Sequence, residues 1–383
     1  MSGEIPVTLL EASTPALILD RARLQANCDR MKKRCSGIGT RLRPHMKTLK
    51  SIDAARYAID DSHGGVAVST LNEADYFAQE GVTDIQYAVC IVPDKLRRAI
   101  DIQRKAPRFS VFVDCLTTAR KAVEVSKLHN TPLCIWLEID CGEHRTGVDP
   151  EDPAMIEIGR VLTDPAVKFE GLATHAGQSY GASNAEQLRV MAECERATII
   201  SAARKLRDCG IQVDGVSVGS TPTATHLLSS AGLTEIRAGV YMAGDLFQVA
   251  IGSLRLEQVA VTVLATVISH NSRLNQIVVD AGGLALSKDR STATGPGPDL
   301  GYGLVLDIFG RPLGSDLTVV EVHQEHGQVR STSRLPFEIL PVGAKIRVVP
   351  NHVCMTAAMY ERYLVVDGSD AVVDTWGRTG GWS

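Results

Sequence analysis

A lysine follows a short run of apolar and basic residues, Arg43-Pro44-His45-Met46, that has the character of a β-strand. A lysine amine at the end of a strand can form a Schiff base with a carbonyl compound once burial or a neighbouring cation lowers its pKa. Arg43 and His45 would supply such cationic surroundings for Lys47. Because most lysines are simply exposed to water, this interpretation depends on further motifs elsewhere in the chain.

Two other stretches carry residue types that suit an anionic ligand. One is the loop that follows the apolar run 134–139 and contains Arg145. The other combines a turn of small and hydroxyl residues with a downstream Arg-x-Gly element, comprising Gly219, Ser220, Thr221, Arg237, Gly239 and Val240. Backbone N–H groups, hydroxyl donors and the start of a helix together predict a cup for a phosphate group. An ordinary capped helix with Pro222 in its first turn is the alternative.

His352 and Cys354 stand two positions apart in the segment Pro350-Asn351-His352-Val353-Cys354. If this segment is extended, the two side chains point to the same side, and an imidazole and a thiolate can then share one metal ion. Two unrelated buried side chains are the alternative, because free cysteine is among the most buried residue types.

Together these motifs resemble those of the D-serine dehydratase and D-threonine aldolase family, relatives of alanine racemase that use pyridoxal phosphate and a metal on a fold-type-III scaffold. The resemblance covers almost the whole chain and implies that Lys47 carries the cofactor. It also implies a dehydratase, because the aldolases of the family have aspartate where this chain has Cys354. The other cofactor residues that it implies are Arg145 near the cofactor hydroxyl, Arg237 at the pyridine nitrogen, Gly239 and Val240 beside the predicted phosphate cup, and His175 and Tyr180 in an active-site segment.

The implied reaction is a β-elimination in which Lys47 and His175 are the catalytic residues. Lys47 holds pyridoxal phosphate, is released when the substrate amine binds, and then removes the α-proton of a D-amino acid. Arg237 would weaken the cofactor as an electron sink, so a metal that assists the departing β-hydroxyl becomes more valuable. We therefore expect pyridoxal phosphate and a divalent metal, Zn²⁺ or Mn²⁺ or Mg²⁺, in a dehydratase that converts D-threo-3-hydroxyaspartate or D-serine to a 2-oxo acid and ammonia. A D-threonine aldolase that releases glycine and an aldehyde is the main alternative; a racemase and a non-catalytic pyridoxal-phosphate-binding protein are weaker ones.

Composition agrees with a two-domain enzyme of the cytoplasm. The chain has 383 residues, of which 44% are hydrophobic and 22% charged, and its net charge is −4. Such a balance gives no basic footprint for nucleic acid, and no apolar run is long enough for a membrane span. The N-terminal residues lack the basic stretch and following apolar run of a signal peptide. We expect a homodimer that acts on a small D-amino acid. The nine cysteines lack paired spacing and are expected to be reduced, and seven are assigned to packing, namely Cys28, Cys35, Cys90, Cys115, Cys134, Cys194 and Cys209.

The periodicity predicts an α/β fold, a (β/α)8 barrel like that of alanine racemase over residues 21–250, and a β-rich domain formed by residues 1–20 and 251–383. A helix is expected over 185–208, and residues 16–20 are expected to join the second domain. Because active sites of such barrels lie at the carboxyl ends of the strands, the motifs should meet there, where the β domain covers the barrel mouth. Barrel strands are expected near 41–46, 66–69, 86–90, 110–114, 134–139, 171–175, 214–218 and 235–240, and further strands at 259–267, 276–280, 317–322, 345–349 and 363–367, with a loop over 287–303.

Overall fold

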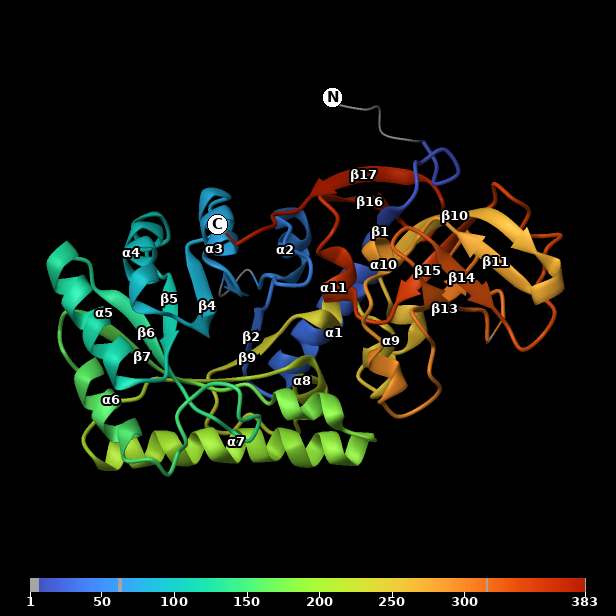
Figure 1. Ribbon diagram of the computed structural model, residues 1–383. Coiled ribbons are helices and arrows are strands. Elements are labelled where there is room, and N and C mark those ends of the chain that lie inside the picture. The colour runs from blue at the N-terminus through green and yellow to red at the C-terminus, as the bar shows by residue number, and fades with distance from the viewer. Residues whose placement is uncertain (1–6, 61–63, 315, 383) are drawn as a thin grey trace. The chain divides into compact units, whose positions relative to one another are not determined.

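The computed structural model describes residues 7–60, 64–314 and 316–382, which form two compact units (Figure 1). The barrel unit consists of the described residues of Arg30–Gly239 and Thr379–Ser383. The β unit consists of the described residues of Met1–Asp29 and Val240–Arg378. The division therefore differs from the expected limits at residues 20 and 250, and the residues after Arg378 go with the barrel unit.

The barrel unit contains an eight-stranded parallel sheet in the order β2-β9-β8-β7-β6-β5-β4-β3. A bridge between His45 and Ala67 joins the two outer strands, so the sheet closes on itself as expected. Most strands are buried along their whole length, which is typical of parallel strands covered on both faces. The strands are β2 (Arg41–Pro44), β3 (Gly65–Val68), β4 (Asp84–Cys90), β5 (Ser110–Val113), β6 (Leu133–Glu138), β7 (Val167–Ala173), β8 (Gly215–Val218) and β9 (Glu235–Ala238).

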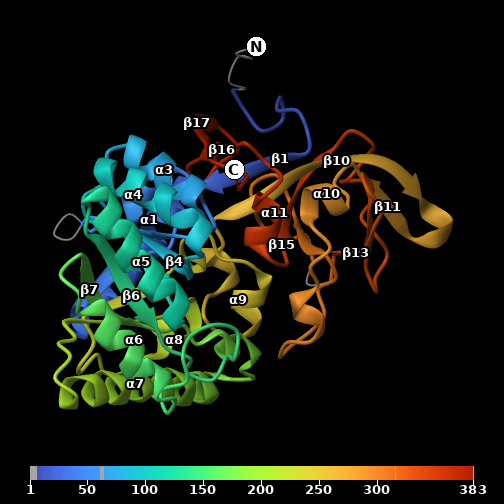
Figure 2. The same ribbon diagram turned by 60° about the vertical axis from the view of Figure 1, so that its left-hand side comes forward.

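Helices alternate with these strands and cover the outside of the sheet (Figures 1 and 2). The longest, α7 (Ala185–Asp208), has the predicted bounds because Asn184 caps it, its side chain accepting a hydrogen bond from the backbone N–H of Gln187. The other helices are α1 (Arg21–Gly37), α2 (Ile52–Ala58), α3 (Leu71–Gln79), α4 (Leu96–Lys105), α5 (Leu116–His129), α6 (Ala154–Leu162) and α8 (Thr221–His226).

The β unit is built on a nine-stranded sheet in the order β11-β14-β13-β12-β15-β10-β1-β16-β17. Its pairs are antiparallel except β1 with β16, so residues 16–20 join this sheet as predicted. Leu9, Ile18, Leu264 and Val366 pack together in one of its core clusters. The strands are β1 (Ala16–Asp20), β10 (Val261–Asn271), β11 (Gln276–Val279), β12 (Gly303–Leu306), β13 (Thr318–Val322), β14 (Gly327–Arg330), β15 (Lys345–Pro350), β16 (Arg362–Val366) and β17 (Val372–Gly377).

The sequence prediction missed three strands of this sheet, β12, β14 and β17. β14 has the sequence Gly-Gln-Val-Arg, with a single large apolar residue, and β17 is partly exposed. Such segments become strands by pairing with neighbours rather than by their own hydrophobic pattern. Three short helices complete the unit: α9 (Leu246–Ala250), α10 (Gly283–Leu286) and α11 (Val353–Ala357).

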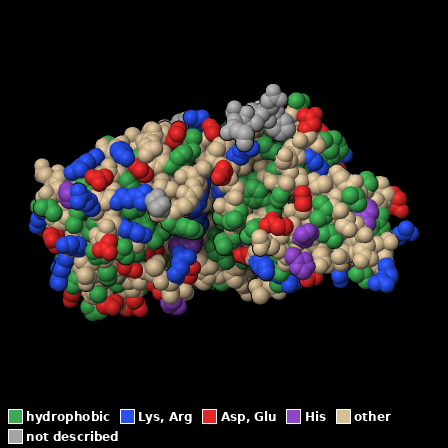
Figure 3. Space-filling view, turned by 45° about the horizontal axis from the view of Figure 1, so that its top comes forward, with side chains coloured by type: hydrophobic (Ala, Val, Ile, Leu, Met, Phe, Trp, Pro, Cys, Tyr) green, Lys and Arg blue, Asp and Glu red, His purple; other side chains and the backbone are tan. Residues whose placement is uncertain are grey.

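The structure bears on the expectations about membranes, surface charge and cysteines. Among the described residues, no helix combines the length and the apolarity that crossing a bilayer requires. On the face drawn in Figure 3, side chains of both charges are interspersed over the barrel unit. The packing role expected of the cysteines was wrong for Cys115, Cys194 and Cys209, which are exposed.

Candidate active site

The carboxyl ends of the barrel strands carry the residues that the sequence singled out. Lys47 lies in the turn after β2, Arg145 in the loop after β6, and His175 directly after Thr174 at the end of β7. Ser220 and Thr221 follow β8, and Arg237 lies within the last residues of β9. Parallel strands of a closed barrel present these ends on one rim, so residues far apart in sequence converge there.

The surroundings of Lys47 differ from the expectation. Its side chain is exposed rather than buried. Arg43 does not face it, because the guanidinium makes buried ion pairs with Glu235 at 2.9 Å and Asp84 at 2.6 Å. His45 does lie near Lys47, but burial and then the charge of Lys47 lower the pKa of His45 well below its usual value, so its imidazole is neutral.

His175 is held as a neutral imidazole of fixed orientation. Its Nδ1 lies 2.8 Å from the carbonyl oxygen of Gly219, and its ring centroid is 6.4 Å from that of Tyr180. Burial, followed by the charges of Lys47, Arg145 and Arg237, lowers the pKa of His175 to about 3. Since Nδ1 must carry the proton to donate to a carbonyl oxygen, the lone pair of Nε2 is the part of the ring left to act as an acceptor.

Arg237 lies fully inside the barrel rim, with 4% of its surface exposed. Its guanidinium donates to the hydroxyl of Ser217 and, at 2.5 Å, to the carbonyl oxygen of Thr174, and it lies 5.4 Å from the ring centre of Phe112. Burial lowers the pKa of Arg237, but an arginine remains charged. The strand therefore fixes a positive charge at the rim.

The loop that carries Arg145 is organised by its own side chains. The carboxylate of Asp140 accepts hydrogen bonds from the backbone N–H groups of Gly142 at 2.8 Å and His144 at 3.1 Å. Gln178 ties this loop to the His175 segment by donating to the carbonyl oxygen of Cys141 at 3.0 Å. Arg145 itself is more than half exposed and pairs with Glu143 at 3.2 Å.

Both glycines of the predicted phosphate turn lie where a side chain would collide with the neighbouring backbone. A Cβ atom at Gly219, whose φ is +134°, would lie 2.1 Å from the carbonyl oxygen of Arg237, and one at Gly239 would lie 2.5 Å from that of His45. Ser220 caps α8 with its side chain, in a capping box with Thr223. Thr221 begins that helix, and Val240 follows Gly239 at the start of a short 3-10 turn in the β unit. The close approach of neighbouring strands thus accounts for the glycines before any ligand is considered.

These residues fit pyridoxal phosphate by the chemistry of their donor set. An exposed amine at Lys47 is available for a carbonyl carbon, and the fixed charges of Arg145 and Arg237 suit an anionic ligand. The neutral imidazoles of His45 and His175 add acceptors without adding charge. The set combines one nucleophile with a cationic rim.

The metal motif lies in the β unit, and its local structure corrects the prediction. The segment is not extended throughout: His352 is the N-cap residue of α11, and Cys354 lies inside that helix. The two side chains still meet, because a hydrogen bond joins them. The predicted pairing of an imidazole with a sulfur is therefore present, although the geometry assumed for it was wrong.

Asp289 was not identified from the sequence, although it contacts the metal motif directly. Its carboxylate lies 2.7 Å from Nδ1 of His352. Burial would lower the pKa of His352, but the hydrogen bonds with Asp289 and Cys354 outweigh it and raise this pKa to about 10. A carboxylate on one ring nitrogen leaves the other nitrogen to bind a metal, an arrangement common in metal sites. An aspartate in a loop of glycine, proline and serine gives no sequence signal for this role.

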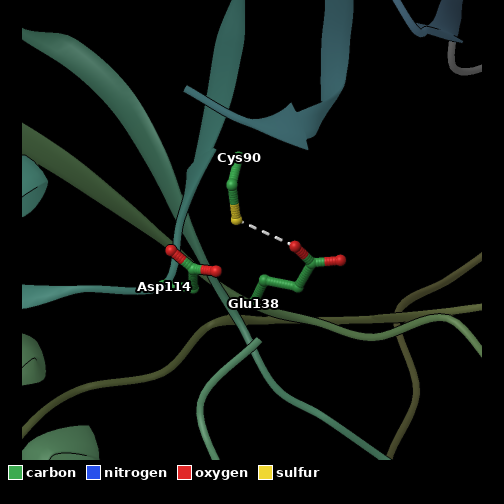
Figure 4. Close-up of side chains that lie close together, drawn as sticks. All are labelled: Cys90, Asp114 and Glu138. Carbon is green, nitrogen blue, oxygen red and sulfur yellow. Dashed lines mark hydrogen bonds between the residues drawn. The ribbon is translucent and has the colours of Figure 1, made fainter. Parts of the chain in front are cut away.

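A second group of potential ligands lies at the ends of β4, β5 and β6 (Figure 4). Ligand atoms of Cys90, Asp114 and Glu138 lie within 4.8 Å of one another, and the thiol of Cys90 donates to Glu138 at 2.9 Å. Burial, together with the two carboxylates, raises the pKa of Cys90 far above its usual value. The sulfur is thus a protonated hydrogen-bond donor, and Cys90 is more than the packing residue expected from the sequence.

Comparisons with known proteins cover almost the whole chain. The family model described as the alanine racemase N-terminal domain matches residues 19–246, and that of the serine dehydratase domain matches residues 260–366. The chain is 41% identical to the D-threo-3-hydroxyaspartate dehydratase of Delftia sp. over 98% of this chain and 99% of that protein. It is 32% identical to the D-serine dehydratase of Dictyostelium discoideum over 97% of each chain.

Comparison with solved structures gives the same result as comparison with known sequences. A cysteine-to-alanine variant of D-threo-3-hydroxyaspartate dehydratase, described as metal-free, superimposes with a TM-score of 0.94 at 39% identity over 98% of this chain and all of that one. The D-threonine aldolase of Filomicrobium marinum gives a TM-score of 0.86 at 25% identity over 99% and 98% of the two chains. The expected family, fold and enzyme class are confirmed: the chain belongs to the alanine racemase-like family of pyridoxal-phosphate-dependent lyases that includes the D-serine and D-threo-3-hydroxyaspartate dehydratases.

Proposed function

We propose that this protein is a dehydratase, dependent on pyridoxal phosphate and a divalent metal, that converts D-threo-3-hydroxyaspartate or D-serine to a 2-oxo acid and ammonia. The observation that carries the proposal is the pair His352 and Cys354, joined by a hydrogen bond and oriented by Asp289, in a chain similar over its full length to two dehydratases. The metal-free cysteine variant of a similar dehydratase supports a ligand role for Cys354.

Lys47 is proposed to hold the cofactor and to move the substrate's α-proton. Bound pyridoxal phosphate would supply an electron sink for the negative charge that develops at the α-carbon. The side chain of Lys47 is exposed, which gives it room to move between the two tasks. His175, neutral with Nδ1 anchored on Gly219, is proposed to accept a hydrogen bond through Nε2.

The remaining rim residues are proposed to hold the cofactor. Arg237, fixed by Ser217 and Thr174, would face the pyridine nitrogen as a donor that cannot release its own proton. Arg145 and Tyr180 would flank the ring. The phosphate would lie at the turn made by Gly219, Ser220, Thr221, Gly239 and Val240.

His352 and Cys354 would hold a divalent metal through an imidazole nitrogen and a thiolate, a donor set that favours Zn²⁺ and that also accommodates Mn²⁺ or Mg²⁺ when water completes the shell. Such an ion would act there as a Lewis acid toward the β-oxygen of the substrate. We also propose that the enzyme is a homodimer of the cytoplasm. The proposal of a homodimer rests on the family resemblance, and the proposal of a cytoplasmic location rests on the sequence pattern.

Product analysis tests the reaction. The purified enzyme, supplied with pyridoxal phosphate and metal, should convert D-threo-3-hydroxyaspartate or D-serine to ammonia and 2-oxo acid in equal amounts, whereas L-serine should react far more slowly. Lys47→Ala is the negative control, and chelation of the metal should stop turnover. Glycine and acetaldehyde as the main products from D-threonine would replace the proposed reaction with a retro-aldol cleavage.

A further inference from the structure

Helix α7 carries a carboxylate where its pattern requires an apolar residue. Its buried face is lined by Leu188, Ala192, Ile199, Ala202 and Leu206, at the spacing of one helix stripe, and Glu195 lies in the middle of that stripe. Only 1% of Glu195 is exposed. Burying a carboxylate is unfavourable unless hydrogen bonds replace its water, so a specific interaction must keep it there.

That interaction is with the backbone of two active-site segments. One oxygen of Glu195, Oε1, accepts the N–H of Ala176 at 3.0 Å and the N–H of Gly219 at 2.9 Å. A side-chain hydrogen bond with Thr223 adds a third partner. Ala176 follows His175, and Gly219 begins the proposed phosphate turn, so one carboxylate joins the segment after β7 to the turn after β8.

The next peptide unit, between Gly219 and Ser220, orients the imidazole. Its N–H, that of Ser220, donates to the hydroxyl of Thr223 at 3.1 Å, and Thr223 is in turn hydrogen-bonded to Glu195. Its carbonyl, that of Gly219, is thereby held in a fixed direction as the acceptor for Nδ1 of His175. The hydroxyl of Thr223 also bonds to Ser220, whose side chain caps α8 and contacts Ser179 at 3.0 Å. Through these hydrogen bonds, Glu195 helps to keep the proton of His175 on Nδ1 and helps to fix the backbone of the phosphate turn.

We propose that Glu195 is a positioning residue of the cofactor site, whose buried carboxylate clamps the His175 segment to the phosphate turn. This inference rests on the proposed function, because it assumes that the phosphate of pyridoxal phosphate lies at the turn of Gly219 and Ser220. Glu195 touches neither substrate nor cofactor in this proposal. Its effect passes through the backbone of Ala176 and Gly219.

The test compares the binding of pyridoxal phosphate and of pyridoxal, which differ only in the phosphate group. Each is titrated into the full-length protein freed of cofactor and followed by visible absorbance. The wild type should bind the phosphorylated form more tightly. In Glu195→Ala, the ratio of the two affinities should fall by about tenfold or more, since the buried N–H of Gly219 in the turn loses its hydrogen-bond acceptor. If Glu195 served only the stability of the fold, its loss would weaken the binding of both ligands equally and leave the ratio of the two affinities unchanged.

Two variants sharpen the comparison. Glu195→Gln should keep the ratio within about threefold of the wild type, because its amide oxygen can still accept both N–H groups. Glu193→Ala removes an exposed carboxylate on the same helix that pairs with Arg196 at the surface, and should leave the ratio unchanged. Loss of the ratio in Glu195→Ala with retention in these two variants supports the clamp.

Each remaining outcome has a definite meaning. A wild-type ratio in Glu195→Ala overturns the inference. If this variant does not fold, Glu195→Asp replaces it, since its carboxylate is one methylene shorter and cannot reach both N–H groups; retention of the ratio there also overturns the inference. A wild type that binds pyridoxal as tightly as pyridoxal phosphate contradicts the proposed phosphate site itself, whatever Glu195 does.

Discussion

Asp289 and His352 form a carboxylate–imidazole pair that gives the metal motif its orientation. The carboxylate lies 2.7 Å from Nδ1, so only Nε2 of the imidazole is left for an ion. The hydrogen bond with His352 lowers the pKa of Asp289 to about 2, so the carboxylate is ionised at neutral pH. A metal ligand held in this way needs no reorientation when the ion binds.

Asp289→Asn should therefore weaken metal binding by about 10- to 100-fold, because the amide neither fixes the ring as firmly nor raises its basicity. Competition with a chromogenic chelator measures the affinity directly. Asp299→Asn is the matched control, since Asp299 lies in the same loop but pairs with the partly exposed Arg290. Equal metal affinities for Asp289→Asn and the wild type would contradict the orienting role.

His175 gives a pH prediction at the same scale. Burial, with the nearby cations, lowers its folded pKa to about 3, whereas an unfolded chain has the ordinary value of 6.5. As the pH falls below about 6.5, His175 of the unfolded state takes up a proton, whereas His175 of the folded state stays neutral until about pH 3. The free energy of unfolding therefore decreases between these two pH values. The ring C–H resonances of His175, followed by NMR in the full-length protein, should stay constant from pH 5 to 8. A titration midpoint near 6.5 would show that the ring is not held neutral.

The end of β8 lies very close to β9 at the barrel rim, and Gly219 makes this close approach possible. Gly219 follows β8 with a φ of +134°, and a Cβ there would lie 2.1 Å from the carbonyl oxygen of Arg237. The strands approach this closely only because the residue has no side chain. The position of Arg237 and the course of the phosphate turn therefore depend on one backbone contact.

Gly219→Ala should destabilise the protein by about 2–4 kcal/mol, from the strained φ together with the overlap. Gly210→Ala isolates the first cause, since Gly210 also has a positive φ, +79°, but nothing within 4 Å of its Cβ position. This control should cost about 1 kcal/mol. Thermal and urea unfolding of both variants measure the difference. Equal losses of stability in the two variants would mean that the overlap with the Arg237 carbonyl oxygen contributes nothing.

At the scale of the barrel, a buried ion network links strands that are distant in sequence. The carboxylate of Glu235 on β9 accepts from Arg43 at 2.9 Å and Arg41 at 2.7 Å on β2, and from Gln86 at 3.1 Å on β4. Arg43 also pairs with Asp84 at 2.6 Å. Burial alone would raise the pKa of Glu235, but Arg43 and Arg41 outweigh it and lower this pKa to about 2.

Glu235→Gln should cost about 3–5 kcal/mol at pH 7, because it leaves buried guanidinium charges without their partner. The folded pKa is depressed, so this stabilisation is present above the unfolded value of 4.5 and is lost as the pH falls toward about 2. The wild type and the variant should thus converge in stability between pH 4.5 and pH 2. Glu193→Gln, at an exposed pair, should change little at any pH. A gap between wild type and Glu235→Gln that stays constant on acidification would contradict the linkage.

The sequence by itself determined the barrel strands and the residues at their carboxyl ends. Barrel strands such as β3, β5 and β6 are short runs of mainly apolar residues, and the period of helix 185–208 was clear enough to give its bounds, because local hydrophobic patterns report which faces are buried. The spacing of His352 and Cys354 suggested a metal pair, and the family resemblance made that assignment. The resemblance then supplied the family, which the comparisons confirm.

The tertiary structure decided which side chain faces which. Arg43 appeared to be a neighbour of Lys47, but it turns to Glu235 and Asp84, and His352 meets Cys354 through a helix start rather than a strand. Asp289 gave no local signal, and Glu195 showed only as a break in an apolar stripe, because their partners lie 63, 19 and 24 positions away in the chain. A sequence pattern records burial, whereas a hydrogen bond to a distant backbone group depends on how the strands and loops are brought together, and only the folded chain sets that.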